Sequence, residues 1–237
     1  MLVFRNEGEP PQIEGLTIQS THGFHKAVDR LRDVTLKDKP ILHPYRMSKI
    51  TLERVSIEDL YPCALYVLTE NLNRVQKLRE AFLKQGIDLL QMKVDKALVN
   101  YSWEGKENCV ITPPLIEVSE DDGGIMMVVD GLHRVIKARE FRLKTMVVTK
   151  IENISLPLPV LPVGWDEVKV VNTVPPAEQK RRYRFSSMDE IRKWEESNQE
   201  RFVQAFDWGD SFMSRILERE QIIKTYTVLY APWDCPG

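Results

Sequence analysis

A short apolar run, an Asp-Gly pair, a His-Arg pair and a helical pattern follow one another between residues 125 and 140. Ile125 to Val129 is uniformly apolar and rich in β-branched residues, which predicts a buried strand. The apolar residues that come next, as far as Phe141, are spaced as in a helix. The polar cluster from Asp130 to Arg134 is therefore predicted to lie at a strand-to-helix junction.

Such a junction favours the binding of an anion. Backbone N–H groups without partners and the positive end of the helix dipole are found at the start of a helix. Gly131 lets the main chain approach a ligand closely or adopt a positive φ. Arg134 can fork onto two phosphate oxygens, and His133 can donate a hydrogen bond or move a proton. We interpret Asp130–Arg134 as a phosphate-binding corner, in which Leu132 contributes its backbone.

An Asp-Gly pair between apolar residues is also typical of a two-residue β-hairpin turn. Val129–Leu132 would fit such a turn. We favour the strand-to-helix interpretation, because the residues after Leu132 follow helical rather than alternating spacing.

Length, charge and cysteine content limit the classes of protein that need to be considered. The 237 residues suit one large domain or two small ones. A net charge of −2 gives no general attraction to nucleic acid or to an anionic membrane. No apolar run approaches the ~20 residues of a membrane span, and the N-terminal residues show no export signal. The three cysteines lack zinc-site spacing, so we expect a cytoplasmic protein with reduced thiols.

The sequence predicts an α/β (α+β) protein with a mixed sheet. Strands and helices alternate along its middle part, and the expected elements are a strand at 50–57, a helix at 72–83 ended by Gly86, strands at 113–118 and 125–129, the helix after residue 131, and a strand at 144–151. Residues 88–112 fit either an inserted hairpin or a short helix. We expect an N-terminal extension over 1–49, a core over 50–152, and a smaller α+β C-terminal lobe over 153–237, entered through a proline-rich connector.

Four segments of the core together resemble the ParB/sulfiredoxin fold superfamily. They are Leu115–Val118, the acidic-glycine turn at 120–124, Met126–Arg134 and Leu143–Val148. In that superfamily a turn at a helix start holds nucleotide phosphate, so the resemblance implies a nucleotide-binding core over about residues 50–152. Sulfiredoxins carry a catalytic cysteine where this chain has Leu132, which argues against their chemistry. The part after residue 152 has too few helices and too little basic charge for the DNA-reading module of the partition proteins.

The Asp-Gly-x-His-Arg turn is nearest in motif to the free L-serine kinases of this fold. The resemblance implies a kinase that transfers phosphate from ATP or ADP, with Mg²⁺, to a small hydroxyl substrate such as free L-serine. Those kinases have a glutamate before the first helix as the general base, and Glu70 takes that place here. They tend to have a histidine before this glutamate, where this chain has Thr69. By residue type, Glu70 is equally consistent with an ordinary glutamate at a helix start.

Two further sites carry open alternatives. Asp130 is predicted either to coordinate Mg²⁺ or to cap the helix that follows it. Lys180, Arg181 and Arg182 form the densest positive patch, and they are either a clamp for phosphate or a substrate carboxylate, or a solvated basic turn.

Two functions remain open at this point. The first is the kinase, with its site in a cleft between core and C-terminal lobe and with a nucleotide and a small molecule as partners. The second is a nucleotide-binding regulatory or DNA-transaction module, ParB-like or nuclease-like, without phosphoacceptor chemistry. A nucleic-acid partner is not favoured, and the sequence does not predict an oligomeric state.

Overall fold

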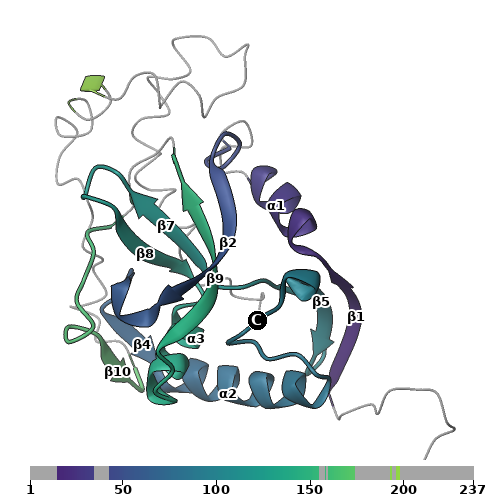
Figure 1. Ribbon diagram of the computed structural model, residues 1–237. Coiled ribbons are helices and arrows are strands. Elements are labelled where there is room, and N and C mark those ends of the chain that lie inside the picture. Colours follow the sequence, from purple (N-terminus) through teal and green to yellow (C-terminus); the bar gives the residue numbers. More distant parts are fainter. Residues whose placement is uncertain are drawn as a thin grey trace, which may run out of the picture.

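A five-stranded mixed sheet forms the centre of the protein (Figure 1). The computed structural model describes residues 15–34, 43–154, 158, 160–173, 193, 196 and 197. The sheet has the order β2 (Lys49–Ser56), β9 (Thr145–Glu152), β7 (Leu115–Ser119), β8 (Ile125–Asp130) and β3 (Leu60–Pro62). β2 pairs antiparallel with β9, and β8 pairs antiparallel with β7. β7 pairs parallel with β9, and β3 pairs parallel with β8. The predicted α+β class with a mixed sheet is confirmed.

Two helices cover one face of this sheet. They are α2 (Thr69–Lys84) and α3 (Leu132–Glu140), and both contribute to one buried cluster with the sheet residues Ile116, Val128 and Val148. α2 ends as predicted, because Gly86 adopts a φ of +73° and Ile87 N–H bonds back to the Phe82 carbonyl at 3.0 Å. Within the described residues, no helix has the length and apolar character needed to span a membrane.

A second, three-stranded sheet packs against the other side of α2. It has the order β1 (Leu16–His22), β5 (Leu98–Trp103) and β6 (Lys106–Ile111). Of the inserted hairpin and the short helix that the sequence allowed here, residues 98–111 form the hairpin, after a short 3₁₀ turn at Val94–Lys96. Phe82 of α2 meets Tyr101 of β5 edge to face, with ring centroids 5.1 Å apart. β1 and α1 (Phe24–Arg32) belong to the predicted N-terminal extension, yet β1 pairs along the length of β5.

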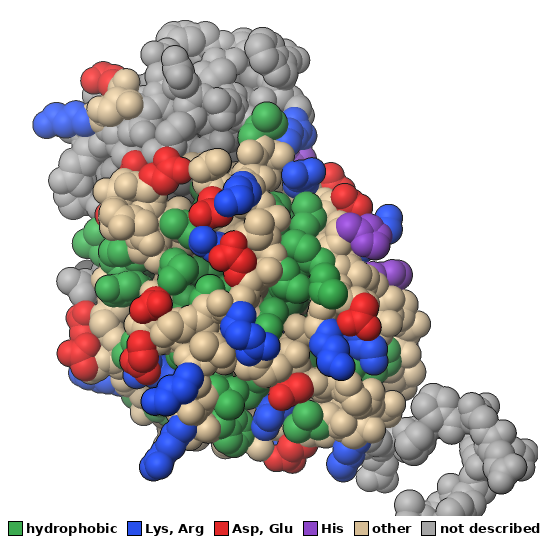
Figure 2. All heavy atoms as spheres, in the orientation of Figure 1, with side chains coloured by type: hydrophobic (Ala, Val, Ile, Leu, Met, Phe, Trp, Pro, Cys, Tyr) green, Lys and Arg blue, Asp and Glu red, His purple; other side chains and the backbone are tan. Residues whose placement is uncertain are grey.

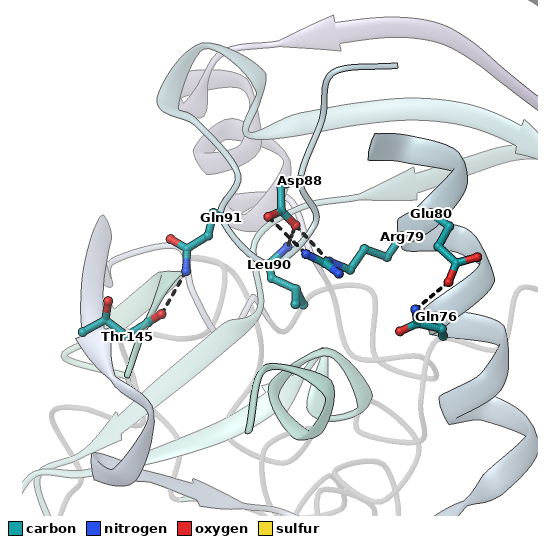
Figure 3. Close-up of polar contacts among 7 residues, drawn as sticks. All are labelled: Gln76, Arg79, Glu80, Asp88, Leu90, Gln91 and Thr145. Atoms are coloured by element: carbon teal, nitrogen blue, oxygen red, sulfur yellow. Dashed lines mark hydrogen bonds and ion pairs between the residues drawn. The ribbon is translucent and has the colours of Figure 1, made fainter. Parts of the chain in front are cut away.

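The loop after α2 connects this helix to the rest of the molecule through side chains (Figure 3). Arg79 of α2 pairs with Asp88 at 3.2 Å, and the Gln91 amide donates to the Thr145 carbonyl of β9 at 2.9 Å. The Arg79 guanidinium also lies 4.7 Å from the centre of the Phe141 ring, just after α3. These contacts set the position of α2 relative to α3 and the central sheet.

The other face of the central sheet is covered by α1 and by irregular chain. Leu115, Met127 and Ile151 pack there with Leu31 of α1, Tyr45, Ile154, Leu158 and Val160. The Tyr45 hydroxyl donates to the fully buried Glu117 carboxylate at 2.6 Å.

A last short strand returns the chain to the start of α2. β10 (Lys169–Val171) pairs parallel with β4 (Tyr66–Leu68), and the Thr69 hydroxyl donates to the Val171 carbonyl at 3.2 Å. Residues 160–171 thus pack on the core, although they lie beyond its predicted end at residue 152. Beyond residue 173, the predicted C-terminal lobe lies outside the described residues except at 193, 196 and 197.

Candidate functional site

The predicted corner is a strand-to-helix junction, as expected. β8 ends at Asp130, Gly131 is the N-cap of α3 with φ +80° and ψ +19°, and α3 begins at Leu132. A positive φ is accessible to glycine at little cost, which explains the residue type here. The hairpin alternative is wrong, because the chain continues into a helix rather than a second antiparallel strand.

The first turn of α3 leaves two backbone donors unused. The Gly131 carbonyl accepts from Arg134 N at 2.9 Å and from Val135 N at 3.1 Å. No side chain caps the helix, so the N–H groups of Leu132 and His133 have no hydrogen-bond partner in the part of the chain that the structure describes. These donors and the positive end of the helix dipole make an anion-binding position.

The side chain of Arg134 is turned into the protein rather than toward solvent. Its Nη1 donates to the Thr112 carbonyl, and its Nη2 donates to Asp130 Oδ2 at 3.2 Å. Only 7% of the side chain is exposed. Burial lowers the pKa of Arg134, and the Asp130 carboxylate opposes that change.

Gly131 lies directly against this guanidinium. A Cβ added to Gly131 would stand 2.7 Å from Arg134 Nη2 and 2.9 Å from the Cβ of Pro114. Both are closer than real Cβ contacts, so the corner has no room for a side chain at residue 131. The backbone of the β6–β7 connection, which supplies Thr112 and Pro114, is a part of the corner that no motif in the sequence predicts.

Residues 26–169, from α1 into β10, match the ParB CE domain. The chain belongs to this family. No curated protein and no solved structure matches the chain. The ParB-like part of the resemblance is confirmed, and the likeness to the free L-serine kinases stays a prediction.

Asp130 of this ParB CE domain does not cap α3. The cap alternative is wrong, because Gly131 is the N-cap and the Asp130 carboxylate accepts from Arg134 instead. The side chain is 27% exposed, so its carboxylate remains in reach of solvent and of a cation. Within the described ranges, no group of three or more His, Cys, Asp or Glu residues is arranged as a metal site. Asp130 therefore offers a single carboxylate.

His133 is the second residue of α3 and is partly buried. Burial lowers the pKa of His133 below that of a free histidine, Asp130 raises it, and the charge of Arg134 lowers it further. The folded corner therefore favours the neutral imidazole, which can donate or accept a proton near neutral pH.

We expect this shift in pKa to make stability depend on pH. Below about pH 6.5 the unfolded chain binds a proton at residue 133 more readily than the folded chain, so stability falls as the pH is lowered. Replacing His133 by glutamine should reduce the loss of melting temperature between about pH 7.5 and about pH 5.5. Melting curves of both proteins test this, and parallel pH profiles would contradict it.

The remaining predicted residues form no bond with the corner or lie outside the described chain. Glu70 is exposed in the first turn of α2, and no hydrogen bond or ion pair joins it to the described side chains. Two residues further on, Leu72 packs in the same buried cluster as Leu132 of α3, so the first turns of both helices share one patch of core. Lys180, Arg181 and Arg182 lie outside the described residues.

The surface charge is mixed on the face drawn in Figure 2. Basic and acidic side chains alternate there, and histidine side chains lie over the region of α1. Such a face lacks the single-signed potential that steers a nucleic acid onto a protein.

Proposed function

We propose that this ParB CE domain protein binds a nucleotide and holds one of its phosphate groups at the start of α3. The observation that carries the proposal is the pair of unused N–H groups of Leu132 and His133 next to Gly131. A phosphate oxygen at this place would accept two charge-assisted hydrogen bonds and would lie in the positive field of the helix end. The buried charge of Arg134 lies behind the same turn.

The nucleotide would be ATP or ADP accompanied by Mg²⁺. Mg²⁺ in nucleotide sites is held by one or two carboxylates, the phosphates and water. Asp130 is the residue of the corner that would hold it, through the part of its carboxylate that faces solvent. When bound, the cation supplies charge neutralisation between the carboxylate and the phosphates.

We further propose that the protein is a kinase for a small hydroxyl substrate, with free L-serine as the first candidate. Glu70 would remove the hydroxyl proton, His133 would donate to or exchange a proton with the transferred group, and the segment 180–182 would clamp the substrate or phosphate. The packing of Leu72 in the same cluster as Leu132 supports the proposal only in that the first turns of α2 and α3 share one patch of core. Positioning and charge neutralisation provide most of the catalysis in phosphoryl transfer.

The alternative is a nucleotide-binding regulatory module without phosphoacceptor chemistry. One observation favours it: Glu70 is exposed and forms no bond with the described residues of the corner. Both functions require the same phosphate position, so nucleotide binding is the first property to measure.

Calorimetric titration of ATP and ADP with Mg²⁺ into the wild-type protein and into His133→Glu tests the phosphate position. The new carboxylate would repel phosphate at the start of α3. We therefore expect affinity to fall by about a hundredfold, the amount expected if the two charge-assisted hydrogen bonds to phosphate were lost, or binding to disappear. The same carboxylate should stabilise the helix by about 0.3–1 kcal/mol, which separates loss of binding from loss of folding.

His25→Glu is the matched control. His25 is also the second residue of a nine-residue helix with a glycine N-cap, since α1 follows Gly23, and it is exposed. This variant changes the net charge equally and should bind nucleotide as the wild type does. Absence of nucleotide binding by the wild-type protein, or equal affinity in His133→Glu, would overturn the proposal.

A further inference from the structure

We propose that Arg134 is a positioning residue, which holds the Gly131 turn in the shape that presents the Leu132 and His133 N–H groups, and does not itself bind the ligand. This inference deepens the proposed function and rests on it. It assigns to the arginine a different role from the direct phosphate contact that the residue type predicts.

The guanidinium joins the start of α3 to the end of β8 and to the β6–β7 connection. It belongs to α3, its Nη1 donates to Thr112 in the β6–β7 connection, and its Nη2 donates to Asp130 at the end of β8. A planar guanidinium presents its donors at fixed angles, so two acceptors on two segments determine its orientation. The turn between Asp130 and α3 is thereby attached to the backbone in front of β7.

A direct phosphate contact would have to break this arrangement. The Arg134 side chain is almost fully buried, so a phosphate could reach the guanidinium only by displacing Asp130 or the Thr112 carbonyl. A partly buried carbonyl that loses its charged donor costs free energy, and the unused N–H groups of Leu132 and His133 offer the phosphate a position without that cost.

Gly131 and Arg134 depend on each other sterically. A Cβ at residue 131 would lie only 2.7 Å from the guanidinium Nη2, closer than two such atoms can approach. The absence of a side chain at Gly131 is therefore a condition for the buried arginine, besides being a condition for the positive φ of this residue.

Arg134→Lys separates a positioning role from a charge role. Lysine keeps the positive charge but lacks the fork, so a positioning role predicts that affinity for ATP with Mg²⁺ falls by about tenfold or more. The salt dependence of the remaining binding should equal that of the wild type, because the number of charges at the site is unchanged. Arg139→Lys, on the same helix and in an exposed ion pair with Glu58, is the control and should leave affinity unchanged. Wild-type affinity in Arg134→Lys would overturn the inference.

A double-mutant cycle tests the inference without any ligand. Gly131→Ala should lower the melting temperature of the wild-type protein, and it should lower that of Arg134→Lys by a smaller amount, because Nη2 is no longer present to collide with the new Cβ. Equal losses in both backgrounds would show that the two residues are independent and would contradict the inference. Absence of nucleotide binding by the wild type would overturn the proposed function, and the cycle would still decide the role of Arg134.

Discussion

Glu70→Gln is expected to lower phosphoryl transfer to L-serine by about 10²–10⁴-fold while leaving nucleotide affinity unchanged. The glutamine keeps the size and polarity of the side chain but cannot accept the hydroxyl proton. Glu70 lies in the first turn of α2 and contributes none of the proposed phosphate donors on α3, so its loss should not alter the binding of ATP or ADP. Turnover is measured with labelled nucleotide and serine, and affinity by calorimetry on the same preparation.

Glu80→Gln is the matched control for this experiment. Glu80 is an exposed glutamate ten residues further along α2, about 15 Å along the helix axis. Full activity of Glu70→Gln would identify Glu70 as an ordinary helix-start residue. If the wild-type protein binds nucleotide but shows no transfer to any hydroxyl substrate, the regulatory module is the better description.

Arg134→Ala is expected to destabilise the protein by about 2–4 kcal/mol. From the sequence alone, this substitution is predicted to weaken nucleotide binding by ~1.5–3 kcal/mol and to leave folding intact. The structure changes the second part of that expectation. Alanine would remove the donors to Thr112 and Asp130 and would leave the Thr112 carbonyl without the charged donor it has among the described residues. Urea unfolding followed by tryptophan fluorescence measures the difference, and an unchanged m-value would show that stability alone has changed.

Lys49→Ala provides the comparison for Arg134→Ala. Lys49 forms an ion pair with Glu152 at 2.7 Å, shorter than that of Arg134 with Asp130, but 60% of its side chain is exposed. Solvent screens such a pair, so its loss should cost less than about 1 kcal/mol. A similar cost for both variants would mean that burial of Arg134 contributes little to stability. Because Arg134→Ala combines loss of folding with loss of binding, His133→Glu is the sharper test of the phosphate position.

Much of the fold could be predicted because its signals are local. The apolar run before Asp130, the helical spacing after it and the glycine that ends α2 each depend on neighbouring residues, and the structure confirms each of them. The ParB-like resemblance also rests on such local segments, and the family match bears it out. The three-stranded sheet was less predictable, since β1 and β5 are about 80 residues apart and their pairing leaves no local pattern in either strand.

From the sequence alone one could predict which residues make up the candidate corner. These are an acidic residue, Gly131 at the turn, and His133 and Arg134 in the first turn of the helix. Only the tertiary structure decided the direction of the arginine. The side chain could extend toward solvent or fold back, and it folds back because the β6–β7 connection brings the Thr112 carbonyl within hydrogen-bonding reach of the guanidinium and places Pro114 next to Gly131. Thr112 is 22 residues away in the sequence, so no spacing rule places it there. Long-range packing therefore makes Arg134 a buried part of the corner, whereas the unpaired N–H groups follow from the local start of a helix.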